Sequence, residues 1–252
     1  FGEKVERTGL ECTDGGVQAA IGGDHRHGQL RVLLLDVLDP APHVRYSAGL
    51  YKEMAGVRVG VPEAALEGIE AGVAAAFGAA VDAVAQAGAE VVRIDTPSAD
   101  DFDLAVLTGL VITRAEAAAY HTAFGDQRFR YAMPAVAEQL EAATQVSAVD
   151  YLQAQRVRED LRWRMLRLLE HFDALLMPTT RLAAPKSDEA DNYHLVLAQN
   201  CILWSLVGFP ALTLPCGLTP GRLPVGAQLV AAPFEDARLL ALAAALEVAL
   251  NG

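Results

Sequence analysis

Two short β-branched runs with a helical pattern between them limit the folds open to this chain more than any other feature. Val57–Val61 and Glu90–Ile94 are rich in valine and isoleucine, which favours strands. Between them, apolar residues recur every three or four positions over residues 66–84, which predicts a helix with one apolar face. Gly88 follows, where a left-handed glycine commonly ends a helix. The order strand, helix, strand predicts a parallel pair joined by a right-handed connection.

The alternation of strands and helices continues to the end of the chain. A capping pattern at Ser147 predicts the start of a long helix. With that one, we expect further helices at residues 30–38, 104–121, 134–144, 148–168, 190–206 and 236–250. We expect one mixed sheet with strands at residues 57–61, 90–94, 172–177, 211–215 and 225–230. These strands are apolar throughout, which is typical of a sheet covered on both faces. The predicted fold class is therefore α/β, a layered α/β/α arrangement.

The first thirty residues differ from the remainder. They are polar and glycine-rich and show no period, so we expect residues 1–30 to form an irregular arm and residues 31–252 to form a single α/β domain. His25 and His27 lie in this arm without a third ligand at suitable spacing. We therefore expect no bound metal and no cofactor.

Composition excludes some partners. Hydrophobic residues make up 52% of the 252 residues, the formal net charge is −12, and the sequence pI is about 4.9. This acidic balance argues against nucleic acid or an anionic membrane as the main partner. One helix is locally basic, and we expect its arginines to spread over a solvated face. They are Arg156, Arg158, Arg162, Arg164 and Arg167.

The cysteine pattern and hydropathy indicate where the chain works. Its three cysteines, Cys12, Cys201 and Cys216, have no paired spacing, so we expect no disulfide framework and no zinc site. A reducing compartment, the cytoplasm, follows from this pattern. No apolar run approaches the roughly 20 residues that a membrane span needs.

Three segments, taken in order, carry a family resemblance. They are Met54–Pro62, Phe172–Thr180, and residues 199–217 with the Pro-Val-Gly-Ala-Gln strand at 224–228 behind them. Together they resemble the C-terminal half of the amidase-signature family, serine hydrolases that cleave carboxamide C–N bonds. The resemblance covers roughly residues 30–250. It implies the C-terminal part of an amidase-type fold and an amide-hydrolase function.

The family's catalytic region has no counterpart in this sequence. Its members use a Ser–cis-Ser–Lys triad beside a glycine-rich loop, since a serine hydroxyl needs a base and the tetrahedral oxyanion needs preorganised donors. No serine here neighbours another serine or lies in such a loop, and no lysine has the family's setting. The serines are Ser47, Ser98, Ser147, Ser187 and Ser205, and the lysines are Lys4, Lys52 and Lys186. We assign no catalytic residue and expect the isolated chain to be inactive.

The resemblance still implies residues of a substrate pocket. The loop after Met177 and Pro178 approaches substrate in the family, and an asparagine often precedes its Gly-x-Pro turn. The substrate-binding candidates are Thr179, Thr180, Asn200, Tyr120 and Trp204. For each of them the alternative is a structural role, either in a capped turn or as a bonded polar group in the core. Cys216 is expected to be a small packed residue, because the family often has cysteine there without using it.

Three functions remain open at this point. The first is the C-terminal part of an amidase whose catalytic half is encoded with it or supplied by a partner. The second is a non-catalytic paralogue that binds a ligand or a partner, and the third is a decayed gene product. The chain begins at Phe1 without a methionine, and we expect it to be a fragment or a processed piece. The expected partners are a small carboxamide, an N-terminal amidase half, or a second copy of the chain.

Overall fold

The structure, a computed structural model, describes residues 11–13, 16–18, 54–125, 134–189 and 193–251. The chain divides into two units, residues 1–45 and 46–252, and each is described by itself. The helix predicted at residues 30–38, the two arm histidines and the predicted boundary after residue 30 lie outside the described residues.

The first unit contains a short antiparallel strand pair. β1 (Glu11–Thr13) pairs with β2 (Gly16–Gln18), with Cys12 opposite Val17. The segment predicted to be irregular therefore contains regular structure. Its Asp14-Gly15 sequence is common in hairpin turns, and this local signal favours two strands over an extended arm.

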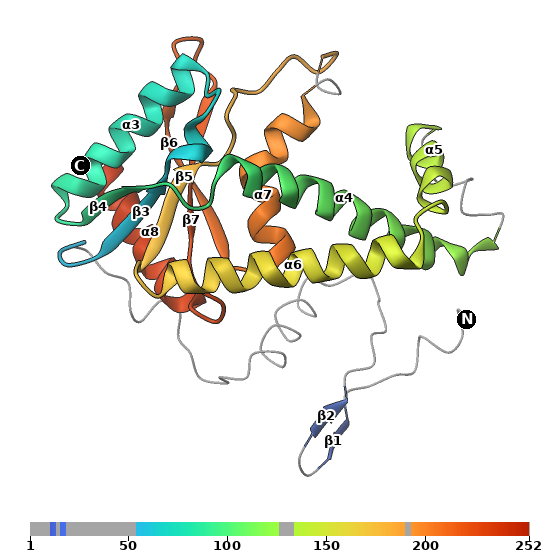
Figure 1. The fold of residues 1–252 in the computed structure, drawn as a ribbon. Helices are drawn as coiled ribbons and strands as arrows, with labels where there is room; N and C mark the ends of the chain where they lie inside the picture. The colour runs from blue at the N-terminus through green and yellow to red at the C-terminus, as the bar shows by residue number, and fades with distance from the viewer. Residues whose placement is uncertain (1–10, 14–15, 19–53, 126–133, 190–192, 252) are drawn as a thin grey trace. The chain divides into compact units, whose positions relative to one another are not determined.

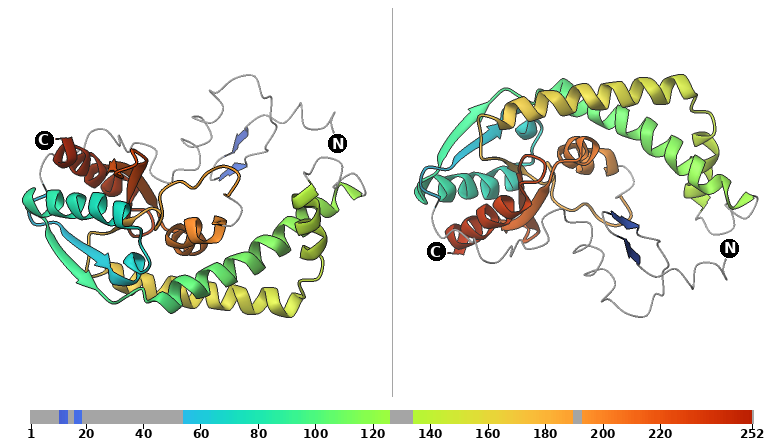
Figure 2. Two further views of the ribbon diagram at one scale, coloured as in Figure 1. Left: turned by 90° about the horizontal axis from the view of Figure 1, so that it is seen from above. Right: turned by 90° about the horizontal axis from the view of Figure 1, so that it is seen from below.

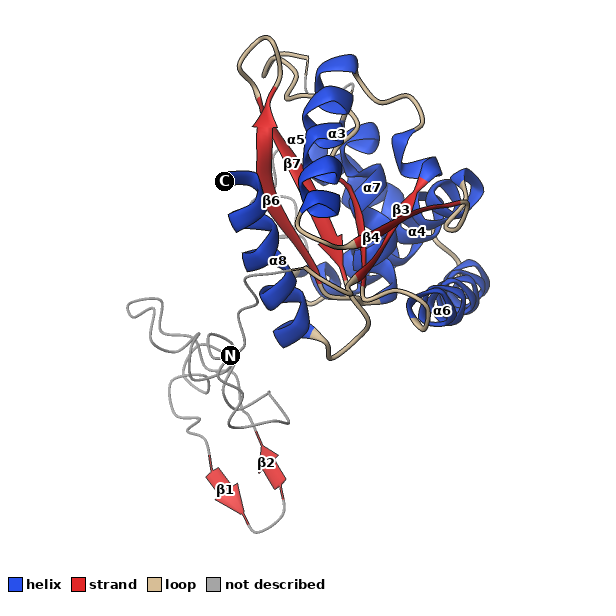
Figure 3. Ribbon diagram, turned by 90° about the vertical axis from the view of Figure 1, so that its left-hand side faces the viewer, coloured by secondary structure: helices blue, strands red, loops and turns tan. Residues whose placement is uncertain are grey.

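The second unit is built on one five-stranded mixed sheet (Figure 1). Its strands are β3 (Arg58–Pro62), β4 (Glu90–Ile94), β5 (Ala174–Pro178), β6 (Ala211–Leu218) and β7 (Pro224–Val230). The order across the sheet is β4-β3-β5-β7-β6, so β4 and β6 lie at its two edges (Figure 3). β3 is parallel to β4 and to β5, whereas β7 is antiparallel to β5 and β6. The predicted single sheet and the predicted parallel pair are confirmed.

Helices cover both faces of this sheet (Figures 1 and 2). α3 (Ala71–Gln86) and α8 (Asp236–Asn251) pack on one face. α4 (Ala99–Thr122), α6 (Ala148–Leu169) and α7 (His194–Val207) pack on the other. A shorter helix, α5 (Pro134–Ala143), packs against α4. The layered α/β/α fold class predicted from the sequence is confirmed.

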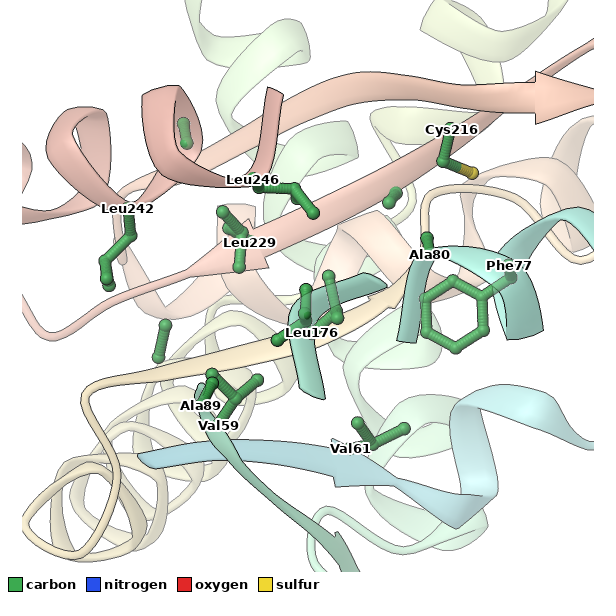
Figure 4. Close-up of a cluster of buried hydrophobic side chains, with 14 of the residues drawn as sticks. Val59, Val61, Phe77, Ala80, Ala89, Leu176, Cys216, Leu229, Leu242 and Leu246 are labelled. Carbon is green, nitrogen blue, oxygen red and sulfur yellow. The ribbon is translucent and has the colours of Figure 1, made fainter. Parts of the chain in front are cut away.

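Successive residues of β5 face opposite layers, which places an apolar core on each side of the sheet. Ala174 and Leu176 belong to the core under α3 and α8, and Leu175 and Met177 belong to the core under α4, α6 and α7. All four are fully buried. Figure 4 shows Leu176 of the first core. Around it the figure labels Val59, Val61, Phe77, Leu229, Leu242 and Leu246.

Two helices begin at residues other than those predicted. The apolar period starts at Leu66, but α3 starts at Ala71, because Gly68 adopts a positive φ of 65° after a short 3₁₀ turn. Leu66 still packs against the core, so burial alone extended the periodic pattern. α4 starts at Ala99 because Ser98 and Asp101 form a capping box, each side chain bonding the other's backbone N–H.

Candidate functional site

The end of β5 lies where the carboxyl ends of three parallel strands meet, which is the edge at which open α/β sheets commonly bind ligands. Thr179 and Thr180 follow this strand and are half-buried. The Thr179 hydroxyl lies 3.0 Å from the Thr213 hydroxyl of β6, and the Thr180 hydroxyl donates to the Leu182 carbonyl at 2.8 Å. Both hydroxyls are therefore held by neighbouring residues of the chain.

Gly226 of β7 lies between Thr179 and Thr213 and has no space for a side chain. A Cβ atom there would come within 2.7 Å of Thr213 Cγ2 and 2.8 Å of Thr179 Oγ1. The glycine therefore allows the two threonine hydroxyls to approach each other across β7.

Arg181 follows the β5 threonines and is buried, with 8% of its surface exposed. Its Nε donates to Asn200 Oδ1 at 3.0 Å, Nη1 to the Glu67 carbonyl at 3.1 Å, and Nη2 to the Ala64 carbonyl at 2.9 Å. Burial lowers the pKa of Arg181, while the nearby carboxylates of Glu67 and Asp103 raise it. This guanidinium joins the loop after β5 to the turn after β3 and to α7.

Asn200 of α7 is fully buried, and its polar atoms are bonded within the protein. Besides accepting from Arg181, it donates from Nδ2 to the carbonyls of Ala65 at 3.1 Å and Pro178 at 2.9 Å. Gln228 Nε2 donates to the Asn200 carbonyl at 3.1 Å. These bonds hold α7 on the end of β5. A contact of Asn200 with substrate stays a prediction.

Trp204 and Tyr120 lie in different surroundings. Trp204 is 1% exposed, and its Nε1 donates to Met177 Sδ at 3.3 Å. Tyr120 is 67% exposed near the end of α4, where its ring lies 5.4 Å from that of His121. Hydrogen bonds thus place Asn200 and Trp204 beside the end of β5 with Thr179, whereas none joins Tyr120 to this group among the described residues. Substrate contact by each candidate stays a prediction.

A cavity of about 390 Å³ lies between α4, α6 and α7. Most of its wall is apolar, and each of the three helices contributes to it. The lining residues are Gly109, Leu110, Ile112, Thr113, Glu116, Arg158, Ile202, Ser205 and Leu206. A concave, largely apolar site with a few polar groups is typical of a small-molecule pocket. Ser205 lies one residue after Trp204 and is the cavity residue closest in sequence to the predicted set.

A chain of hydrogen bonds connects the two charged residues of this cavity. Arg158 Nη1 donates to Gln155 Oε1 at 3.3 Å, Gln155 Nε2 donates to the Tyr151 hydroxyl at 2.9 Å, and that hydroxyl donates to Glu116 Oε1 at 3.1 Å. Three of these residues lie on α6 at spacings that place them on one side of a helix. The bonds therefore fix α6 against α4 at the cavity.

The arginines of α6 correct one prediction. A solvated face is right for Arg156 and Arg167, which are exposed, and wrong for Arg158 and Arg162. Arg158 lines the cavity, and Arg162 Nη1 donates to the Val207 carbonyl at 2.7 Å while its guanidinium lies over the Phe209 ring. Helical spacing alone did not reveal that α6 packs between α4 and α7 and so has polar contacts on two sides.

The described cysteines and Ser205 are not activated nucleophiles. Burial raises the pKa of Cys216 to about 11, an effect that a backbone hydrogen bond partly offsets, and burial also raises the pKa of Cys201. Both thiols stay protonated at neutral pH, and the thiolate is the nucleophilic form. The Ser205 hydroxyl has no hydrogen-bond partner among the described residues, so no base is in place to take its proton.

Comparison with known proteins agrees with this architecture. The Amidase family model matches residues 17–240. The 2-amino-5-chloromuconic acid deaminase of Comamonas testosteroni is 35% identical over 208 residues, which cover 78% of this chain and 44% of the deaminase. A glutamyl-tRNA(Gln) amidotransferase subunit of Salinispora arenicola is 34% identical over 244 residues, covering 84% and 49%. A crystal structure of an amidase superposes with a TM-score of 0.68 at 29% identity, covering 79% and 46%. The chain therefore belongs to the amidase family, whose signature the sequence predicted.

The chain spans about half the length of the curated relatives it matches. The family match starts at residue 17, inside the segment that was predicted to be an arm. Within the described part of the chain, no helix is long and apolar enough to cross a membrane. No group of three potential metal-binding side chains is found among the same residues.

Proposed function

We propose that this chain forms the substrate-binding part of an amide hydrolase that cleaves carboxamide C–N bonds. The observation that carries this proposal is the cavity between α4, α6 and α7 in a chain that belongs to the amidase family. The cavity has room for a small carboxamide, and its apolar walls would pack against an amide placed beside Ser205. Thr179, Thr180, Asn200, Tyr120 and Trp204 remain proposed substrate contacts or supports of that site.

The catalytic groups come from outside the residues of this sequence in our proposal. Amide hydrolysis needs a serine whose proton is removed as its oxygen attacks the carbonyl, and donors that bind the developing oxyanion. Ser205 has neither a bonded base among the described residues nor a glycine-rich loop beside it. A polypeptide segment that matches the remaining half of the relatives would supply both. The isolated chain is then inactive.

The sheet offers a place for that segment. β6 is an edge strand, and the side chains of Ala211, Thr213 and Pro215 are exposed on it. Its second edge has no strand partner among the described residues, and unpaired strand edges favour pairing with another strand. We expect an N-terminal amidase half, or failing that a second copy of this chain, to cover β6. The cytoplasmic location stays a prediction that rests on the cysteine pattern.

Ammonia release from butyramide tests the proposal. The purified chain alone should give no release above background. Adding the N-terminal half of a relative, such as the Pseudomonas putida amidase, should restore measurable release and should protect the β6 amides from hydrogen exchange. Release by the chain alone that Ser205→Ala abolishes would contradict the proposal.

A non-catalytic ligand-binding role is the second candidate, and the unactivated Ser205 is the observation that favours it. The same experiment separates the two. Tight binding of butyramide by the chain, with no release after addition of the N-terminal half and no protection of β6, supports the binding module over the enzyme.

A further inference from the structure

The charged side chains of the cavity are of opposite sign and come from different helices. Glu116 belongs to α4 and Arg158 to α6, and the remaining lining residues are neutral. No ion pair joins these two side chains, since among the described residues the hydrogen-bond partner of Arg158 is Gln155 and that of Glu116 is Tyr151. Two neutral side chains therefore lie between an acid and a base that line the same cavity.

This neutral bridge leaves Arg158 with hydrogen-bonding capacity. It uses one N–H of the guanidinium, at a long 3.3 Å, and the other N–H groups have no partner among the described residues. A guanidinium presents its donors in a planar fork that matches a carboxylate. The bond from Tyr151 meanwhile stabilises Glu116 as a carboxylate on the opposite helix, so Glu116 does not neutralise Arg158 directly.

We infer that the ligand of this cavity carries a carboxylate group, which Arg158 binds, and that Gln155 and Tyr151 are positioning residues that hold Arg158 toward it. The inference rests on the proposed function, because it names the class of amide that the site accepts. Apolar walls favour it, since a charge-assisted bond is stronger where water is excluded. The net charge of −12 also favours it, because an acidic protein repels anions except where a local cation attracts them.

Two amides that differ in one group test the carboxylate. Glutaramate has an amide at one end and a carboxylate at the other, and glutaramide has amides at both ends. We expect the full chain to bind glutaramate about tenfold more tightly by isothermal titration calorimetry at neutral pH, the increment typical of a hydrogen bond to a charged group. High salt should reduce this preference.

Arginine variants test the assignment to Arg158. Arg158→Gln should bind the two amides equally, and Arg158→Lys should retain part of the preference. Arg156→Gln is the matched control, because Arg156 lies on the same helix, is exposed and does not line the cavity. That control should leave both dissociation constants unchanged. If Arg158→Gln does not fold, the lysine variant and the salt dependence still test the assignment.

Tyr151→Phe tests the positioning role. It keeps the ring and removes the hydroxyl through which Gln155 is connected to Glu116. We expect the affinity for glutaramate to fall severalfold while the affinity for glutaramide stays the same. A structural role alone would weaken the binding of both amides together.

The outcomes separate this inference from the proposed function. Equal affinities for glutaramate and glutaramide overturn the carboxylate inference and leave the amide site in place. Tighter binding of 5-aminopentanamide than of glutaramate also overturns it, because Glu116 would then dominate. If none of these amides binds, the cavity is not the substrate site, and both the inference and the proposed function fail.

Discussion

The two faces of the sheet are built differently, although the same strands form both. Under α3 and α8 the core is apolar, and Cys216 is its most polar member. Under α4, α6 and α7 the apolar core is joined by Arg181, Asn200 and Gln228, and the cavity opens beside them. The first face therefore stabilises the fold by packing alone, whereas the second also has to satisfy buried polar groups.

This difference indicates where the chain can hold a ligand. Burying a polar group without a partner costs free energy, and among the described residues no buried side-chain nitrogen or oxygen lacks one. The second face thus has its polar groups fixed by hydrogen bonds before any ligand arrives. Such preorganisation is what a binding site needs and a packing core does not.

The apolar face should show the largest effect on stability and none on binding. Leu176→Ala removes a fully buried side chain from the core under α3 and α8, and Leu→Ala changes of this kind cost about 2–5 kcal/mol of unfolding free energy. Denaturant unfolding measures this loss, and the amide dissociation constants should not change. Leu107→Ala, at a position that is 64% exposed, is the control and should change stability by less than about 0.5 kcal/mol.

On the second face, Arg181→Met should be nearly as costly and should also weaken binding. It leaves Asn200 Oδ1 and two backbone carbonyls without donors, and unsatisfied buried acceptors cost about 1–3 kcal/mol each. We expect a net loss of about 2–4 kcal/mol, because the methionine recovers some packing. A loss below that of Leu107→Ala would show that the polar network contributes little.

Glycine replacements should differ in sign between a sheet position and a helix position. A Cβ at Gly226 meets Thr213 and Thr179 at distances under 3 Å, and such overpacking costs about 1–3 kcal/mol. Gly78 of α3 has nothing within 4 Å of an added Cβ, so Gly78→Ala should stabilise by about 0.5–1 kcal/mol. Thermal melts of the two variants measure both effects, and the same sign for both would contradict the close approach at Gly226.

The first face was easier to predict from the sequence than the second. The strands and the parallel pair follow from β-branched runs and helical periods, which are local patterns. The cap at Ser98 was also readable, since it begins a Ser-x-x-Asp pattern, but the prediction followed the apolar residues instead. Where a pattern of burial continued through a non-helical turn at Gly68, the predicted helix began too early.

The cavity could not be predicted in the same way. Glu116 and Arg158 are distant in the sequence, and only the packing of α4 on α6 brings them to one cavity. Arg181 gave no signal either, because a lone arginine in a loop is usually exposed and its partners are mostly backbone carbonyls. Such sites depend on tertiary contacts that no local period reports.

The smallest expected effect concerns the thiols on the two faces. Burial raises the pKa of Cys216 from 9.0 to about 11, so the folded chain keeps that proton over a range in which the unfolded chain loses it. The folded state then binds more protons than the unfolded state, and its stability falls as the pH rises from 9.0 to about 11. Unfolding at a series of pH values should show this slope. Cys216→Ala should reduce it more than Cys201→Ala does, because Cys201 lies on the second face and is only partly buried. Equal slopes in the wild type and in Cys216→Ala would show that this thiol is accessible to solvent and that the apolar face is less closed than its packing indicates.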